Sequence, residues 1–265
     1  MTANAPRLLL LVAHADDTEF LAGGTVAKFA AEGYEITEVI ATNNERGSYE
    51  LEGEILIEQS RREALEAARI LGKKEVVFLD YSDGLLSDVP LNELREKFIR
   101  QVRRVRPRVA MTFDPWAPFE AHPDHRAVAM AATEAISFSQ NPCFHPEHAR
   151  EGFPPHLVAE AYYFAKNAAH ANRVVDVSPF IDRKIDALAA HDSQMKLTID
   201  ELRMSIEAVG RFTHVLPMLD RENFRPALEM MIRTWNRNVA KGQSFEYGEA
   251  FRYEAADSLI AEAME

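Results

Sequence analysis

Four short apolar runs in the first half of the chain alternate with segments in which apolar positions recur every three or four residues. The runs lie at residues 7–13, 35–41, 75–79 and 109–113. The first run, RLLLLVA, and the fourth, VAMTF, contain almost no polar position, which is typical of strands buried on both faces of a parallel sheet. The alternation of strands and helices predicts an α/β fold with a doubly wound, mostly parallel sheet flanked by helices.

Helices are expected between these strands at residues 25–31, 54–71 and 91–105, and after the fourth strand at 124–137. In the third helix the apolar positions recur at spacings of three and four, so that one face is buried. A glycine follows each of the first two helices within two residues, as expected where a helix ends.

The second half of the chain is less regular and is expected to be more helical. Residues 141–157 contain four prolines and three histidines and are expected to form a long loop. Further strands are expected at 159–165, 173–177 and 246–253, a helix over 179–190, and two helices within 198–238. No internal repeat or linker divides the chain. We therefore expect a single domain over 1–265, with a core at about 5–195 and C-terminal helices and a strand at about 196–265.

Composition narrows the classes of function. The 265 residues are 47% hydrophobic and 27% charged, with a formal net charge of −12. This charge argues against nucleic acid or an anionic membrane surface as a partner, because phosphates need a basic footprint. Cys143 is the sole cysteine, and the apolar run at 8–13 is too short for a membrane span or a signal segment. A cytoplasmic protein is expected, and a homo-oligomer is compatible with the sequence.

Polar side chains gather directly after two of the apolar runs. His14 and Asp17 follow the first run, and His122 and His125 follow the fourth. In open α/β sheets, ligands bind beyond the carboxyl ends of the strands, at the point where strand order reverses. For a strand order of 3-2-1-4-5, the first and fourth strands are neighbours there. The two polar segments are therefore predicted to meet.

His14, Asp17 and His125 would give a metal two imidazole nitrogens and one carboxylate oxygen. This donor set suits Zn²⁺, with Fe²⁺ as the alternative metal, and three protein ligands leave a position open for water. An open position is typical of a catalytic site, because the metal lowers the pKa of a bound water. Either segment alone would be a weak signal, but together they favour a metal site.

The remaining polar groups have expected roles in catalysis. Asp16 is the candidate general base, His122 is the candidate group that stabilises an oxyanion or protonates the leaving nitrogen, and Asp124 could fix a histidine tautomer. The loop at 43–47 follows the second strand and is interpreted as a substrate-binding loop. Residues 143–148 (CFHPEH) are a weaker metal candidate, because no second ligand motif accompanies them. Dinucleotide, phosphate-loop and serine-nucleophile motifs are absent.

These motifs resemble those of a known family. Residues 13–19 (AHADDTE) resemble the A-H-P-D-D-x-E signature of the PIG-L/LmbE-like deacetylases, and residues 122–126 (HPDHR) match the family's second signature. The similarity spans roughly 7–195, including 79–85 (LDYSDGL) and 190–194 (AHDSQ). The resemblance implies a Rossmann-like fold and a hydrolase that removes N-acetyl groups from small molecules containing N-acetylglucosamine.

The resemblance also implies roles for individual residues. The implied metal ligands are His14, Asp17 and His125, the implied base is Asp16, the implied oxyanion group is His122, and Asp124 is its neighbouring modulator. Implied contacts to the acetylated amino sugar come from Asn43, Glu45, Arg62 and His191. Three positions depart from the family pattern, namely Ala15, Thr18 and Asn44. The last of these bears on the identity of the sugar rather than on the chemistry.

Three alternatives remain open at this point. An amidase could remove a larger acyl group from a sugar or thiol-sugar conjugate. A sugar-binding protein could hold a purely structural metal, although such a site rarely needs an additional aspartate and histidine. A metal phosphoesterase is disfavoured, because no second metal cluster or arginine clamp is evident in the sequence.

Overall fold

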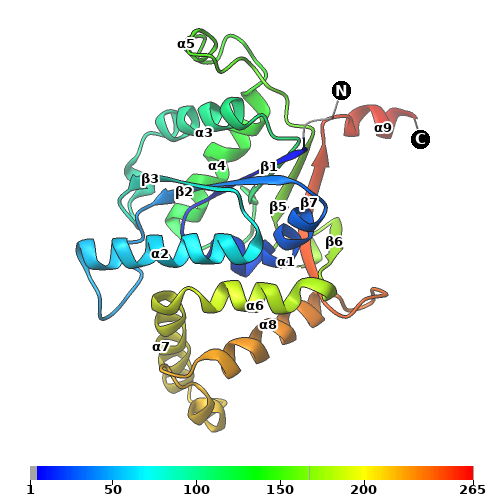
Figure 1. Ribbon diagram of the computed structural model, residues 1–265. Helices are drawn as coiled ribbons and strands as arrows, with labels where there is room; N and C mark the ends of the chain where they lie inside the picture. Colours follow the sequence, from blue (N-terminus) through cyan, green and yellow to red (C-terminus); the bar gives the residue numbers. More distant parts are fainter. Residues whose placement is uncertain (1–4, 167, 265) are drawn as a thin grey trace.

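The strands of the protein form one seven-stranded sheet in the order β3-β2-β1-β4-β5-β7-β6. The computed structural model describes residues 5–166 and 168–264. The first five strands of this order run parallel, and β7 pairs antiparallel with both β5 and β6 (Figure 1). The strand bounds are β1 (Arg7–Val12), β2 (Glu35–Thr42), β3 (Glu75–Tyr81), β4 (Val109–Phe113), β5 (Glu160–Phe164), β6 (Arg173–Asp176) and β7 (Gly248–Ala255).

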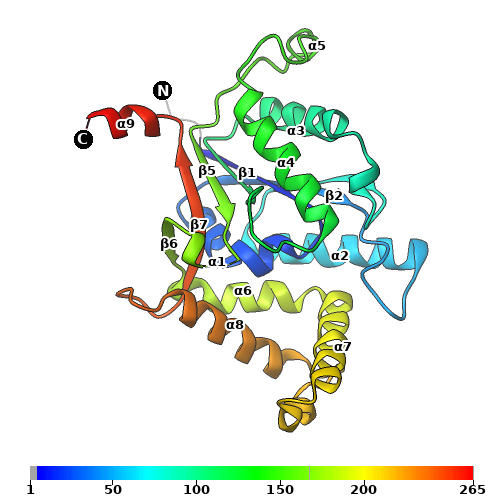
Figure 2. The same cartoon turned by 180° about the vertical axis from the view of Figure 1, so that it is seen from behind.

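Helices cover both faces of this sheet. One face carries α3 (Leu91–Val105) and α4 (Pro123–Phe138), and the other carries α1 (Asp17–Ala31) and α2 (Gly53–Leu71) (Figures 1 and 2). Outside α1 and α2 lies α6 (Ile181–Ala189), which contacts both of them. The remaining α-helices of the described chain are α5 (Glu147–Arg150), α7 (Asp192–Val209), α8 (Arg225–Val239) and α9 (Ser258–Met264). The 3₁₀ helices are η1 (Leu86–Asp88), η2 (Ala168–His170), η3 (Ser178–Phe180) and η4 (Thr213–Met218). No helix in the described part of the chain is long and apolar enough to cross a bilayer.

The strands that position the site are the most deeply buried. Every residue from Leu8 to Val12 is inaccessible to solvent, and Val109, Ala110 and Met111 of β4 beside them are equally buried. A strand covered by helices on both faces must be apolar throughout, because neither face can place a polar side chain in water. The predicted fold class and the 3-2-1-4-5 order of the parallel strands are therefore confirmed.

The first helix begins earlier than the sequence indicated. We expected it to begin at residue 25, after Gly23-Gly24, but α1 begins at Asp17 and includes both glycines. The reason is packing, because a Cβ atom on Gly24 would lie 2.6 Å from the Cβ atom of Val177. These glycines allow close approach to the neighbouring segment, so here they do not mark the end of a loop.

Residues 141–157 form mostly irregular structure, as expected, with the short helix α5 inside it. The fully buried Arg103 guanidinium fixes this segment, since it donates hydrogen bonds to the carbonyl oxygens of Ser139, Asn141, Phe144 and His145. The same cation lies 3.4 Å from a ring nitrogen of His148. A fixed positive charge at that distance disfavours a metal cation among the histidines of this loop.

A buried ion cluster supports the start of α1. Lys73, which follows α2, places its ammonium 2.7 Å from Glu19 Oε1 and 2.7 Å from Glu38 Oε1, and all three side chains are inaccessible to solvent. Burial alone would lower the pKa of Lys73, but the two carboxylates more than offset this and raise it. Burial raises the pKa of Glu38 despite the contact with Lys73. The cluster ties α1, β2 and the end of α2 together.

Replacing Lys73 with methionine should strongly destabilise the fold, because it leaves two buried carboxylates without a cation. Breaking a buried ion pair in this way typically costs about 3–5 kcal/mol. Urea denaturation followed by circular dichroism would measure the change in the free energy of unfolding. The matched control is Lys74→Met, since Lys74 pairs with Glu35 on the surface and should leave the midpoint nearly unchanged. Equal midpoints for both variants would contradict the proposed role of the cluster.

Candidate metal centre

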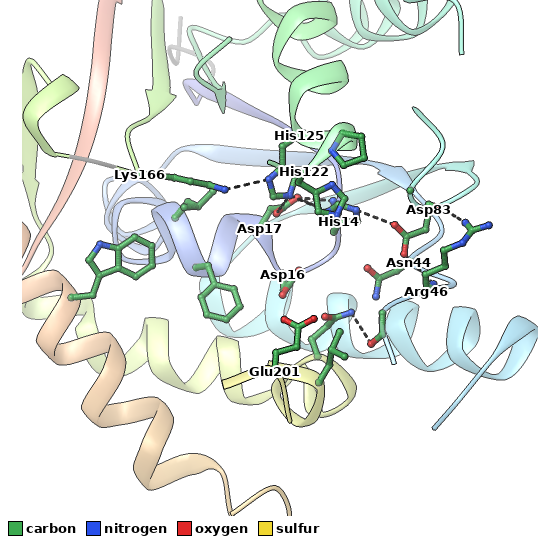
Figure 3. Close-up of a pocket in the computed structure, with 18 residues that line it drawn as sticks. His14, Asp16, Asp17, Asn44, Arg46, Asp83, His122, His125, Lys166 and Glu201 are labelled. Carbon is green, nitrogen blue, oxygen red and sulfur yellow. Dashed lines mark hydrogen bonds and ion pairs between the residues drawn. The ribbon is translucent and has the colours of Figure 1, made fainter. Parts of the chain in front are cut away.

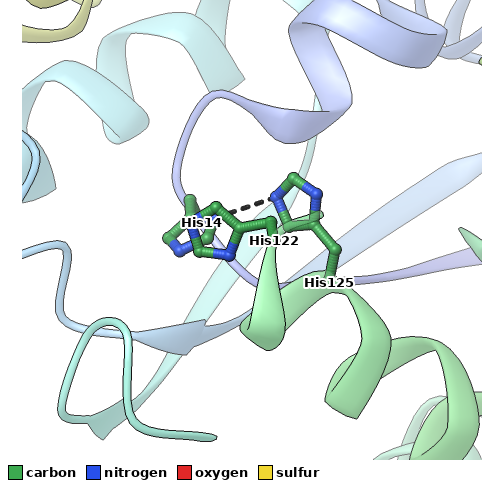
Figure 4. A group of neighbouring side chains, drawn as sticks. All are labelled: His14, His122 and His125. Carbon is green, nitrogen blue, oxygen red and sulfur yellow. Dashed lines mark hydrogen bonds between the residues drawn. The ribbon is translucent and has the colours of Figure 1, made fainter. Parts of the chain in front are cut away.

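The two predicted polar segments meet at the carboxyl edge of the sheet. β1 and β4 are hydrogen-bonded neighbours, so the loop after β1 and the start of α4 lie side by side. His14 lies in that loop, and His122 and His125 lie at the N-terminal end of α4 (Figures 3 and 4). Ring nitrogens of His14, His122 and His125 lie within 4.8 Å of one another. Two segments more than a hundred residues apart therefore form one cluster.

Three side chains point donor atoms at a common centre. His14 Nδ1 lies 3.2 Å from His125 Nε2 and 3.4 Å from Asp17 Oδ2. His125 Nε2 lies 3.1 Å from Asp17 Oδ1. A tetrahedral Zn²⁺ with bonds of about 2.0–2.1 Å holds its ligand atoms about 3.3 Å apart. The 3.2 Å between the two ring nitrogens, and the 3.1–3.4 Å between each nitrogen and one of the two oxygens of Asp17, are compatible with such an ion.

Backbone hydrogen bonds orient the carboxylate of Asp17. Its Oδ2 accepts from the backbone N–H groups of Ala13 and His14, at 3.1 and 2.6 Å. These contacts leave Oδ1 directed towards His125. The turn that joins β1 to α1 thus fixes the carboxylate before any ligand binds, which reduces the cost of ordering the site.

Two further carboxylates hold the other ring nitrogen of His14. His14 Nε2 lies 3.1 Å from Asp83 Oδ1 and 3.4 Å from Asp124 Oδ2. Asp124 is fully buried and accepts hydrogen bonds from the backbone N–H groups of Gly84 and Leu86. A carboxylate behind a ligating histidine fixes its tautomer and raises its basicity. The side chain of Asp124 therefore contacts His14, whereas its contact with His122, the residue it was expected to modulate, is made by its backbone N–H.

His125 has a separate carboxylate partner. Its Nδ1 lies 3.4 Å from Glu120 Oε1, and Glu120 Oε2 lies 2.5 Å from the ammonium of Lys166. The imidazole of His125 also stacks on the ring of Phe113 at the end of β4, with centroids 4.4 Å apart. Phe113 thus fixes the face of the His125 ring, and Glu120 fixes its edge at Nδ1.

The electrostatics of the cluster favour a cation at its centre. Burial alone would lower the pKa of His14, but Asp124, Asp17 and Asp83 raise it well above its usual value. Burial likewise opposes the charge on His125, but Asp17 and Glu120 raise its pKa to about 9. Burial would raise the pKa of Asp17, but His125 and His14 lower it well below its usual value. The carboxylates therefore stabilise positive charge at the position a metal ion would take.

Asp16 lies beside this cluster and lines the same cavity, into which its carboxylate points (Figure 3). Burial and the charge of Asp17 raise the pKa of Asp16 to about 7. A group of this kind can both accept and release a proton near neutral pH. Asp16 therefore has the position and the pKa that a general base needs.

The tautomer of His122 follows from a helix cap. The backbone N–H of Asp124 donates to His122 Nδ1 at 3.2 Å, at the N-terminus of α4. A neutral imidazole that accepts at Nδ1 carries its proton at Nε2. Burial and the neighbouring His14 and His125 lower the pKa of His122. His122 is thus prepared to donate a hydrogen bond from Nε2 while remaining neutral.

These groups line a cavity of about 720 Å³, which we call the catalytic cavity. Its lining also includes the polar side chains Asn44, Arg46, Gln194 and Glu201 and the apolar or aromatic side chains Phe20, Leu197 and Trp235. Figure 3 shows that Glu201 faces the metal cluster from across the cavity. A cavity of this size and mixed polarity suits a small sugar derivative.

The four expected substrate contacts do not line this cavity. Asn43 and Glu45 lie on the expected loop, but their side chains shape it. Asn43 Oδ1 accepts from the backbone N–H of Glu45, and Glu45 pairs with Arg46. Arg62 is exposed on α2. The loop instead presents Asn44 and Arg46 to the cavity.

His191 lies beneath the site rather than in it. Its side chain is fully buried, and burial together with the charge of Lys73 lowers its pKa to about 3. Neither ring nitrogen has a hydrogen-bond partner within the residues that the structure describes. His191 is therefore a neutral, buried side chain that packs beside the Lys73 cluster. A side chain that contacts the substrate would have to be exposed to the cavity.

The sequence interpretation assigned no role to Asp83, Glu120 or Lys166. Asp83 lies in the LDYSDGL segment, which was recognised as similar to the family although no single residue in it was singled out. Glu120 precedes the second signature by two residues, and Lys166 follows β5. A polar residue just beyond the carboxyl end of a parallel strand is the signal that could have identified Asp83 and Lys166.

In this doubly wound sheet the imidazole and carboxylate groups cluster at the point where strand order reverses, which is where open α/β sheets bind their ligands. Residues 9–136 match the family model PIG-L, described as GlcNAc-PI de-N-acetylase. The chain is 30% identical over 200 residues to the diacetylchitobiose deacetylase of Thermococcus kodakarensis, covering 74% of this chain and 73% of that protein. The chain therefore belongs to the PIG-L family, whose members are metal-dependent hydrolases that act on N-acetyl amides.

Two further relatives agree with this assignment. A protein of Bacillus anthracis named as a probable N-acetyl-alpha-D-glucosaminyl L-malate deacetylase is 26% identical over 234 residues, covering 83% of this chain and 95% of that protein. The structure of N,N'-diacetylchitobiose deacetylase from Pyrococcus horikoshii superposes with a TM-score of 0.76 at 27% identity, covering 95% of this chain and 85% of that one. The family and the fold expected from the sequence are thus confirmed.

Replacing Glu120 with glutamine should weaken metal binding about tenfold to a hundredfold, because the carboxylate behind His125 is lost and Lys166 loses its partner. Competition for Zn²⁺ against a chromophoric chelator would measure the affinity. Glu134→Gln is the control, since Glu134 lies on α4, the helix that carries His125, but pairs with Arg95. An affinity unchanged in Glu120→Gln would show that this carboxylate does not support the site.

Proposed function

We propose that the protein is a zinc-dependent deacetylase that removes the N-acetyl group from a small molecule containing N-acetylglucosamine. The observation that carries the proposal is the convergence of His14 Nδ1, Asp17 and His125 Nε2 at separations of 3.1–3.4 Å. Asp16 and His122 lie beside these donors in one cavity. The relatives named above as deacetylases of acetylated amino sugars support the same reaction.

His14, Asp17 and His125 are the proposed metal ligands. Two nitrogens and one oxygen suit Zn²⁺, and Fe²⁺ is the alternative for the same donors. A bound metal of this kind supplies Lewis-acid polarisation of a carbonyl and a lowered pKa for water. Asp83, Asp124 and Glu120 keep the two imidazoles in the tautomers that ligation requires.

Asp16 is the proposed base. It accepts a proton from the attacking water as the water oxygen bonds to the acetamide carbon. It then delivers this proton to the sugar nitrogen as the C–N bond breaks, and acetate and a free amine result. The pKa of about 7 for Asp16 matches both transfers, because the ideal catalytic pKa lies near the operating pH.

His122 is the proposed oxyanion group. During the attack, negative charge develops on the carbonyl oxygen, and a donor that is already oriented stabilises it most effectively. The helix cap leaves the proton of neutral His122 on Nε2, which is the ring nitrogen free to donate. Burial lowers the pKa of His122, which favours the neutral imidazole that donates from Nε2.

Replacing Asp16 with asparagine should lower kcat about a hundredfold to ten-thousandfold while the zinc content stays unchanged, because the base is removed but no ligand is lost. Release of free amine from an N-acetylglucosamine glycoside and elemental analysis would measure the two quantities. Asp80→Asn is the control, since Asp80 pairs with Arg61 on the surface. Full turnover by Asp16→Asn would remove Asp16 from the proposed mechanism.

Removing the metal should abolish deacetylation, and Zn²⁺ should restore it. Dialysis against a chelator followed by titration with Zn²⁺ or Fe²⁺ would also identify the more active metal. The His14→Ala variant should still fold but bind Zn²⁺ more weakly, because His14 supplies one of the three ligands. Turnover that persists in fully chelated protein would contradict the proposed metal dependence.

A further inference from the structure

A second cavity of about 550 Å³ lies between α7, η4 and α8, and we call it the apolar groove. Its walls include Ile199, Leu202, Ile206, Phe224, Leu228 and Met231. The polar lining side chains are two threonines and one asparagine, and no charged side chain of the described chain lines it. Its volume lies within the range of about 300–1,000 Å³ that is typical of small-ligand sites.

The apolar groove adjoins the catalytic cavity at Trp235, which lines both. Helix α7 supplies neighbouring walls, with Leu197 and Glu201 in the catalytic cavity and Thr198 and Leu202 in the groove. At 100° per residue these pairs form adjacent stripes on one side of the helix. Figures 1 and 2 show α7 and α8 converging beyond α6 on the side of the sheet that carries α1 and α2.

The charges in the catalytic cavity indicate what kind of substituent continues into the groove. Among the lining residues of the catalytic cavity, the arginine is Arg46 and the lysine is Lys166. Arg46 pairs with Glu45, and Lys166 pairs with Glu120. An anionic substituent on the sugar would therefore meet no unpaired arginine or lysine there. A neutral, apolar substituent would instead gain from contact with Trp235 and with the walls of the groove.

We propose that the substrate is an N-acetylated amino sugar with an apolar aglycone, an alkyl or aryl chain that passes Trp235 and lies in the apolar groove. This inference rests on the proposed deacetylase function and specifies its substrate class. Three methionines, Met195, Met230 and Met231, line the groove. Their flexible side chains can adapt to chains of different shape.

A series of alkyl glycosides of N-acetylglucosamine, from methyl to octyl, tests the inference. The kcat/KM for amine release should rise about twofold to fourfold with each methylene until the groove is filled. The increase in kcat/KM should come from a lower KM at an unchanged kcat, because the alkyl chain binds equally well in the ground state and in the transition state. A kcat/KM independent of chain length would overturn the inference.

Matched variants locate the effect. Met230 and Met204 are 46% and 49% exposed, but only Met230 lines the groove. In Met230→Glu the preference for octyl over methyl glycoside should fall at least tenfold, with turnover of the methyl glycoside unchanged. Met204→Glu should keep the full preference. An undiminished preference in Met230→Glu would place the chain elsewhere and overturn the inference.

Two further measurements exclude other occupants of the groove. N-octanoylglucosamine tests whether the groove holds the acyl group instead of the aglycone. Turnover of this compound that falls in Met230→Glu would assign the groove to the acyl group. Sedimentation velocity tests a second copy of the chain, and a dimer that dissociates in Met230→Glu would assign the groove to self-association. An inactive N-octanoyl compound and an unchanged sedimentation coefficient both support an aglycone site.

The methyl glycoside separates failure of this inference from failure of the proposed function. Turnover of the methyl glycoside that needs metal, together with a flat chain-length series, would overturn the aglycone site and leave the deacetylase proposal standing. No turnover of any glycoside in metal-loaded protein would overturn both.

Discussion

The buried carboxylate of Asp17 is the group on which the site depends. It lies at the end of the most buried strand, between two imidazoles, where a negative charge without compensation would be costly. Backbone N–H groups of the turn bind Oδ2, which also lies near His14 Nδ1, and Oδ1 lies near His125 Nε2. Because the histidines come from segments after different strands, this compensation requires β1 and β4 to be neighbours. The sheet order and the chemistry are therefore coupled.

Charges outside the central cluster are compensated in a similar way. Each imidazole that faces Asp17 has a carboxylate behind it, Asp83 and Asp124 for His14 and Glu120 for His125. A cluster with so many acids would repel itself without cations, and Lys166 pairs with Glu120 while the buried Lys73 pairs with Glu19 near the start of α1. The negative charge that remains at the centre is what a divalent ion would neutralise. The pKa of Asp16 is raised by burial first, and then by the negative charges of Asp17 and Glu19.

The sequence predicted the parallel part of the sheet and its polar clusters, because both depend on local patterns. A strand buried on both faces must be apolar, and the residues after it occupy a known edge of the sheet. The start of α1 could not be predicted, since the choice of Gly23 and Gly24 depends on Val177 and Lys184, far along the chain. The position of His191 also depends on tertiary packing. It was expected at the substrate, but it is buried beside Lys73. Glu120 lies in a loop without periodicity, so that only the fold reveals its contact with His125.

The chain separates chemistry from recognition along its length. The residues proposed for the reaction come from the turn after β1 and the start of α4, and the parallel sheet holds both rigidly. Part of the wall of the catalytic cavity comes from α7 and α8; α7 packs against α2 and α6, and α8 packs against α6 and β7. Substitutions on α7 and α8 can therefore change what fits beside Trp235 without moving His14 or Asp17. Because only these helices line the apolar groove together with η4, we expect substrate preference to vary within the family through this part of the chain, while the metal cluster stays the same.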